Sequence, residues 1–340
     1  MQALTFTPPV LIIDISMPVF SAFIPEIHRN VSSGFVDILI RTQREELFTG
    51  LMQLHYPPNE NLILTFVEGV EQQLYRCHEN TNEIIPRSAW HQTIDRSGAF
   101  VGLLGLSLEA IRVLRIAYEA PVVRVEHLVL KPEELLEHVG TWLHVVEPSM
   151  VRVQGDQAEY IYLFANCAGS TVETVSLAGG KAQYSISDSF TALDNSKSEY
   201  QVIRYVGTHD HAIWQEYELR MTFNPFVRML MNRFTELAGR TLTERLCEQL
   251  TVWARGGGWN ITLNNNGVID HQFFDALGEA VNAYADILRR FQYEASPAIG
   301  SRLADGISRE VLLKLDDPRR ELLLQHIFTQ QGLGGVTVRA

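Results

Sequence analysis

Few residues in this chain have the type and spacing to do chemistry, and Cys167 is the first of them. It lies in the stretch Asn166-Cys167-Ala168-Gly169-Ser170, where it could act as a nucleophile with His144 or His209 as its base. No recognisable signature joins these residues. A buried thiol in a loop is therefore the simpler interpretation.

His209 and His211 form an H-x-H pair, a spacing known from metal ligands. On a strand both imidazoles would point to the same side, but a metal ion needs a third and usually a fourth ligand. No nearby His, Cys or Asp cluster supplies them, and a polar turn explains the pair equally well. We therefore favour the turn.

Asp14 follows an apolar segment, 10–15, that we predict to be a strand. Phosphoryl-accepting and metal-binding carboxylates often lie at such strand ends. The residues after it, Ile15-Ser16-Met17-Pro18, provide neither a second acid nor a glycine loop. An ordinary edge strand is the better interpretation.

The remaining candidates are pairs of carboxylates and runs of glycine. Neighbouring acids in the first or last turn of a helix serve the helix end or solvent, and they point to different faces. The triple glycine follows a predicted helix, whose negative dipole end repels phosphate, and the spacing of the earlier glycines matches no nucleotide-binding motif. We therefore expect no catalytic, cofactor-binding or metal site at these positions: Glu45-Glu46, Glu133-Glu134, Asp316-Asp317, Gly256-Gly257-Gly258 and Gly98 to Gly105.

Composition limits the classes of partner. The formal charge of −12 and the pI near 5.4 give no positive field for nucleic acid or anionic lipid. No apolar run reaches the roughly 18 to 20 residues that span a bilayer, and no basic residue precedes the apolar patch near the N-terminus, so we expect no signal peptide. The cysteines Cys77, Cys167 and Cys247 are far apart, which predicts buried, reduced thiols in the cytoplasm.

The elements that must position any site begin with residues 33 to 76. Ser32-Ser33 can cap a helix over 35–47 whose apolar residues recur every three or four positions, and Thr49-Gly50 ends it. Three strands then form a meander with a tight turn at Glu68-Gly69. These strands are expected at 51–56, 61–67 and 72–76.

This arrangement resembles the PATAN-type module of bacterial two-component and gliding-motility regulators. The family pattern is a leucine-rich helix, a Thr-Gly pair, alternating apolar residues and a Phe-x-Asp/Glu-Gly turn. Residues Thr49, Gly50, Phe66, Glu68 and Gly69 match it one by one, whereas Val70-Glu71-Gln72-Gln73 departs from the sequence that follows the family's turn. The resemblance implies a non-catalytic interaction or sensing module and transfers no active site.

A weaker copy of this stretch recurs near residues 133–177. A shift of 99 keeps apolar residues on apolar residues, although identities are few and alternating patterns also align by chance. The sequence leaves the duplication open. The shift places Val36 on Leu135, Ile40 on Val139, Leu51 on Met150, Leu54 on Val153, Leu62 on Ile161 and Leu64 on Leu163.

The rest of the pattern completes an α+β fold. We expect irregular chain over 77–106, a helix from Ser107, a strand near 122–130, a helix over 132–148 and a loop over 184–200. From Met221 the period becomes helical. Further signals are a capping box from Thr241, an Asn-Gly hairpin at 264–267, a helix over 273–291, and helix starts at Ser296-Pro297 and Asp317-Pro318.

We therefore predict helix-plus-antiparallel-sheet modules at 1–120 and 121–220, followed by a mostly helical domain at 221–340. The functional hypothesis is a non-catalytic cytoplasmic regulatory or scaffold protein that acts through a protein partner in bacterial signalling. Alternatives are a small-molecule or metal-binding sensor and an enzyme of unrecognised class. The partner's identity and homo-oligomer formation stay open.

Overall fold

The computed structural model describes residues 24–77, 82–142, 147–154, 158–165, 172–178, 180–187, 199–274 and 276–329. It has the expected α+β fold, with antiparallel sheets before a helical C-terminal part. The chain divides into two compact units, one ending at Trp214 and the other beginning at Gln215. Within the described ranges, no helix is both long and apolar enough to cross a membrane.

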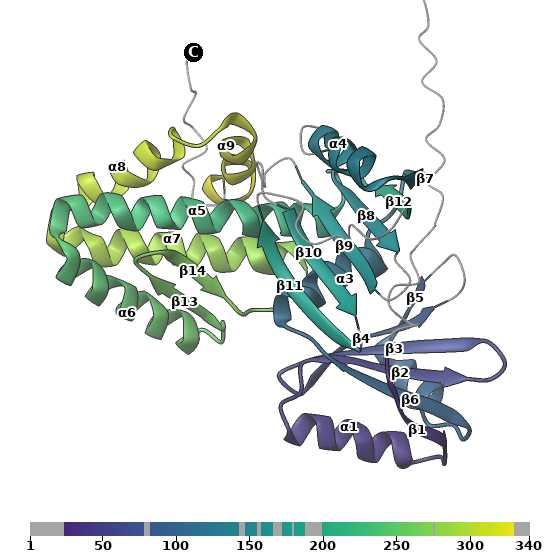
Figure 1. Cartoon of the computed structure of the whole chain (residues 1–340). Helices are drawn as coiled ribbons and strands as arrows, with labels where there is room; N and C mark the ends of the chain where they lie inside the picture. Colours follow the sequence, from purple (N-terminus) through teal and green to yellow (C-terminus); the bar gives the residue numbers. More distant parts are fainter. Residues whose placement is uncertain are drawn as a thin grey trace, which may run out of the picture. The chain divides into compact units, whose positions relative to one another are not determined.

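The first unit begins with a six-stranded antiparallel sheet in the order β1-β6-β2-β3-β4-β5. Helix α1 (Phe35–Glu45) covers one face of it (Figure 1). Its Val36 side chain is buried in the core of the sheet. The predicted helix and meander are confirmed within one or two residues. The strands are β1 (Glu26–Val31), β2 (Gly50–Tyr56), β3 (Glu60–Val67), β4 (Val70–Cys77), β5 (Asn82–Ile85) and β6 (Ala99–Gly105).

A second six-stranded antiparallel sheet follows in the order β7-β12-β8-β9-β10-β11. Helix α4 (Pro132–Trp142) precedes β8 and packs Leu135, Val139 and Trp142 into the core of this sheet. The strands are β7 (Arg124–Leu130), β8 (Ser149–Gln154), β9 (Ala158–Phe164), β10 (Val172–Ala178), β11 (Lys181–Ser187) and β12 (Tyr200–Val206).

The two sheets share one topology. Each has a first strand at an edge, a helix, a four-strand meander, and a last strand inserted beside the first. Equivalent backbone hydrogen bonds lie just before β2 and β8. The Leu106 amide donates to the Thr49 carbonyl at 3.0 Å, and the Gly207 amide donates to the Pro148 carbonyl at 2.8 Å. The two sheets therefore repeat both the strand order and these backbone hydrogen bonds.

The expected 99-residue register holds at the helix and at β2, but it is wrong at β3. Gly50 pairs with Phe66, and the equivalent Ser149 pairs with Phe164, a shift of 98. Leu62 therefore corresponds to Tyr160 rather than to Ile161. Five residues separate His55 from its partner Asn61, whereas four separate the equivalent Gln154 from its partner Glu159. Such a one-residue slip exchanges the two faces of a strand.

The segment expected to be irregular, 77–106, is instead ordered. It contains β5, a short helix α2 (Trp90–Ile94) and the central strand β6. The glycines of β6 suggested a loop, but Gly102 lets β1 approach closely. A Cβ at this position would lie 2.7 Å from the Ile24 side chain and 3.0 Å from the Pro25 carbonyl oxygen.

The Thr-Gly loop and the Glu-Gly turn meet in space. The backbone amide of Glu68 donates to the Thr49 hydroxyl at 2.9 Å, and that of Gly69 donates to the Phe48 carbonyl at 2.8 Å. Glu68 and Gly69 both have positive φ, as a type I′ turn requires. The turn thus anchors the end of α1 over the sheet.

Helix α3 (Leu108–Glu119) follows β6 and is buried along most of its length. Ser107 accepts a hydrogen bond from the Ala110 amide, which confirms the expected N-cap. The helix contacts β5 of the first sheet and β10 and β11 of the second. Its Tyr118 ring stacks on Tyr75 of β4 with ring centroids 4.6 Å apart.

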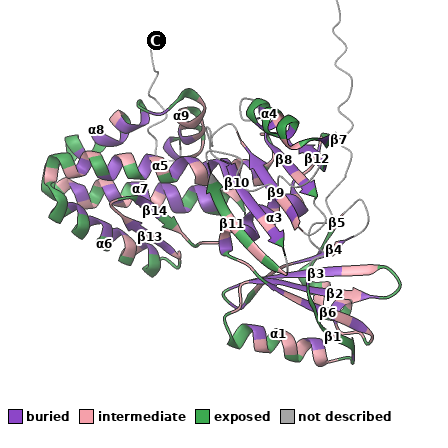
Figure 2. Ribbon diagram, viewed as in Figure 1, coloured by how far each residue is buried: buried purple, intermediate pink, exposed green. Residues whose placement is uncertain are grey.

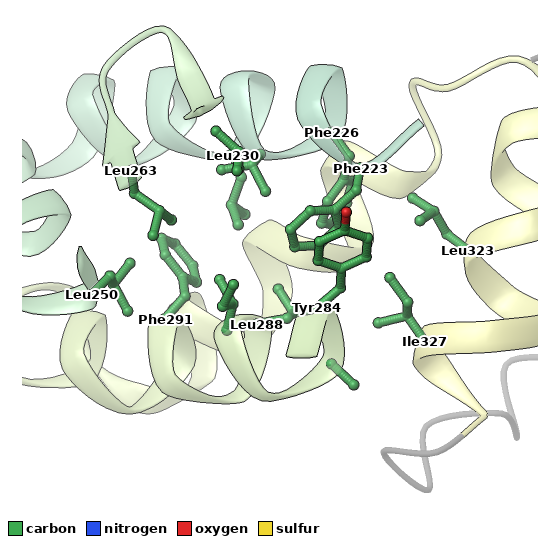
Figure 3. Close-up of a cluster of buried hydrophobic side chains, with 14 of the residues drawn as sticks. Phe223, Phe226, Leu230, Leu250, Leu263, Tyr284, Leu288, Phe291, Leu323 and Ile327 are labelled. Carbon is green, nitrogen blue, oxygen red and sulfur yellow. The ribbon is translucent and has the colours of Figure 1, made fainter. Parts of the chain in front are cut away.

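The second unit is helical and contains one hairpin. Figure 3 shows the core, where Phe223 of α5 stacks on Tyr284 of α7 with centroids 4.3 Å apart. Figure 2 shows exposed residues along the outer sides of α6 and α8. The elements are α5 (Ala212–Ala238), α6 (Arg240–Gly256), β13 (Ile261–Asn264), β14 (Gly267–Asp270), α7 (Leu277–Ile299), α8 (Ser301–Leu312) and α9 (Asp317–Leu323).

Two expected helix starts in this unit are wrong. Helix α6 begins at Arg240 with Gly239 at its N-cap, so Thr241 already lies inside the helix. Helix α7 continues through Pro297, and the next helix starts after Gly300. The Ser296 hydroxyl donates back to the Gln292 carbonyl instead of capping a new helix.

We predict that Gly69→Ala lowers the free energy of unfolding by about 1–3 kcal/mol. Gly69 has φ +79°, and a Cβ there would lie 2.6 Å from the Arg44 carbonyl oxygen. The matched control is Gly140→Ala in α4, where a Cβ meets nothing within 4 Å. This control should instead gain about 0.5–1 kcal/mol, since alanine favours a helix over glycine. Urea unfolding measures both, and equal effects would contradict the packing of the turn on α1.

Candidate functional site

A hollow of about 320 Å³ lies on the first sheet between α1 and the segment that contains α2. Its floor is apolar, with Ile40 of α1, Leu64 of β3 and Ile94 of α2. Its rim is polar and charged, a combination that suits a small polar ligand. The rim residues are Asp37, Arg44, Glu71, Arg87, Trp90 and His91.

One end of the hollow carries two guanidinium groups. Arg44 Nη2 lies 2.6 Å from Glu71 Oε1, and Arg87 Nη2 donates to the Glu71 carbonyl at 3.2 Å. The Arg87 guanidinium lies 5.3 Å from the Trp90 ring centroid, and the Trp90 indole donates to the Ile85 carbonyl at 2.8 Å. The hydrogen-bonded Trp90 ring thus gives the Arg87 guanidinium a fixed aromatic surface to pack on.

At the other end, Asp37 and His91 line the hollow, and Asp95 lies beside them. Asp37, His91 and Asp95 each offer one ligand atom, and these atoms lie within 4.8 Å of one another. Asp37 Oδ2 and His91 Nδ1 are 3.8 Å apart. The three residues come from the first turn of α1, from α2 and from the residue that follows α2.

Asp95 also caps α1 from another part of the chain. Its Oδ1 accepts hydrogen bonds from the Ser33 hydroxyl at 2.8 Å and the Gly34 amide at 2.6 Å. The expected cap at Ser32-Ser33 is therefore wrong, because Gly34 holds the N-cap position and Ser33 donates to Asp95. The hydrogen bonds from Ser33 and Gly34, helped by His91, hold the pKa of Asp95 below its ordinary value against a small effect of burial.

This cluster is not predictable from the sequence as a group, because its members are distant along the chain. The one local signal is the four-residue spacing of His91 and Asp95, one helical turn apart. Asp37 lies more than fifty residues earlier and reaches them only because α1 packs beside α2.

The structure describes only some of the candidates that the sequence suggested. Asp14, His144 and Cys167 lie outside the described residues. His209 and His211 lie in a turn before α5, as predicted, and the Ile213 amide donates to His211 Nδ1 at 3.4 Å. Burial lowers the pKa of His211. Among the described residues, the pair does not belong to a group that could hold a metal ion.

Cys77 and Cys247 are buried free thiols, as expected. Burial raises the pKa of Cys77 to about 12. Burial, with the nearby carboxylates Glu244 and Glu248, raises that of Cys247 to about 11. Because the thiolate is the reactive form, both thiols are poor nucleophiles at neutral pH.

The carboxylate pairs serve helix ends as expected. Glu134 accepts a hydrogen bond from the Lys131 amide at 2.9 Å, and Asp316 accepts one from the Arg319 amide at 3.1 Å. Glu45 and Glu46 lie at the end of α1. The triple glycine from Gly256 ends α6, which confirms its predicted place at a helix C-terminus.

Comparison with known proteins gives no assignment: no protein-family model matches the chain, and no match is found among curated proteins.

We predict that Asp95 contributes stability that is lost in acid. Its pKa is lowered in the folded protein, so its contribution is complete above the unfolded pKa of about 3.9 and disappears as the pH falls through the folded value. Asp95→Asn should therefore flatten the fall in unfolding free energy between about pH 5 and about pH 2. Asp305→Asn, at an exposed position on α8, is the matched control. An unchanged acid profile for Asp95→Asn would contradict the capping role.

Proposed function

We propose that this chain is a non-catalytic regulatory or scaffold protein of the bacterial cytoplasm that acts in signalling by binding a protein partner. The observation that carries the proposal is an aromatic patch on the second unit. The patch consists of Trp253, Trp259, Arg290 and Tyr293.

The four side chains of the patch contact one another through ring–ring and cation–π interactions. The rings of Trp253 and Trp259 meet edge to face with centroids 5.5 Å apart. The Arg290 guanidinium lies 6.0 Å from the Trp253 centroid and 5.0 Å from that of Tyr293. Tyr293 is 69% exposed, so its ring faces solvent.

The composition and support of this patch suit a binding hot spot. Trp, Tyr and Arg are the residues most enriched at such positions, because rigid rings bury a large area at little entropic cost. Arg290 forms an ion pair with Glu294 along α7, and the adjacent Phe291 is buried in the core. Trp253 and Trp259 are partly buried against this core, so the exposed Tyr293 ring lies on a surface that is held in place before a partner arrives.

Two further observations support a non-catalytic role. The described cysteines have raised thiol pKa values, and the carboxylate pairs are used at helix ends. The net charge of −12 disfavours a nucleic-acid partner. The resemblance of residues 33–76 to the PATAN-type module is the basis for placing the protein in bacterial signalling.

We predict that Tyr293→Ala weakens partner binding by about tenfold or more, the usual cost of removing a hot-spot ring. The matched control is Leu303→Ala on α8, which removes an apolar side chain that is 54% exposed. Proteins that copurify with wild type and both variants are compared by quantitative mass spectrometry. Light scattering on the purified protein tests whether the partner is a second copy.

Loss of one partner, or of self-association, in Tyr293→Ala but not in Leu303→Ala would support the proposal. Identical partner sets and identical oligomeric states in all three proteins would refute this patch as the binding surface.

A further inference from the structure

We propose that Asp37, His91 and Asp95 form a binding site for a divalent transition-metal ion of the zinc class. The inference goes beyond the proposed partner binding, because it concerns the first unit and does not depend on the aromatic patch.

The geometry fits one ion with small adjustments. Zinc binds carboxylate oxygen and imidazole nitrogen at about 2.0–2.2 Å, so ligand atoms around one ion lie about 3–4 Å apart. The Asp37 and His91 atoms are already 3.8 Å apart, and all three candidate atoms lie within 4.8 Å. His91 and Asp37 are exposed enough to close the remaining gap by side-chain rotation.

Asp95 is already oriented. One of its oxygens accepts from the Ser33 hydroxyl and the Gly34 amide, which leaves the second oxygen as a ligand. Hydrogen bonds of this kind fix ligating carboxylates in metal sites and raise affinity. Two carboxylates and one imidazole match zinc better than calcium or magnesium, which take oxygen ligands.

The site also has an open side. Asp37 and His91 line the hollow between α1 and α2, so an ion held by three protein ligands would face that space with a free coordination position. A structural zinc site, by contrast, is closed by a fourth protein ligand.

The repeated module shows that the fold does not require an acid at the position of Asp37. Under the register that places Val36 on Leu135, Asp37 corresponds to Leu136 in α4, an exposed leucine. A helix at this place thus packs well without an acid. The carboxylate of Asp37 is a feature of the first module alone.

The test is titration of the full-length protein with ZnCl₂ by isothermal calorimetry. We expect one saturable site in the wild type and an affinity at least about tenfold lower for both Asp37→Asn and His91→Ala. The matched control is His209→Ala, which removes the H-x-H pair and should leave the affinity unchanged.

Cobalt substitution gives a second readout, since Co²⁺ held by the three side chains should show a visible absorption band that His91→Ala loses. Unchanged melting temperatures without metal show that the variants fold. Absence of saturable binding in the wild type, or equal affinity in the wild type and His91→Ala, would overturn the proposal. Loss of binding in His209→Ala alone would also overturn it.

Discussion

The position of helix α1 depends on the contact between the loop that ends it and the turn between β3 and β4. Two backbone amides of the turn donate to this loop, one to the Thr49 hydroxyl and one to the Phe48 carbonyl. Gly69 brings the turn against the backbone of Arg44, where a side chain would collide. The C-terminal end of α1 is therefore fixed over the sheet by groups that lie nineteen or more residues away in the sequence.

The other end of α1 is fixed by Asp95, which supplies the cap that the helix lacks locally. The two helices thus form the charged hollow, with Arg44 at one end and Asp37 at the other. The interactions that hold the two ends of α1 therefore also position the residues that line this hollow.

The second module keeps the topology but not the Thr-Gly pair. Pro148 and Ser149 occupy the positions of Thr49 and Gly50, and the Ser149 hydroxyl accepts a hydrogen bond from Arg204 at 3.3 Å. The Arg204 guanidinium lies 5.6 Å from the Trp142 ring of α4, which makes this helix face a packing surface. Sheet topology survives such changes because strand pairing depends on backbone hydrogen bonds, whereas the helix contacts depend on individual side chains.

The sequence by itself determined the features that rest on local rules. The apolar period of α1, the Glu68-Gly69 turn, the Ser107 cap and the Asn-Gly hairpin each follow from residues within a few positions of one another. Tertiary structure alone decided the rest. Strand β6 contains glycines and became a central strand only through its neighbours. The β3 register depends on one more residue between the paired positions of β2 and β3 than between those of β8 and β9. The cluster of Asp37, His91 and Asp95 exists only because two distant helices share one face of a sheet, and no local pattern records such a packing.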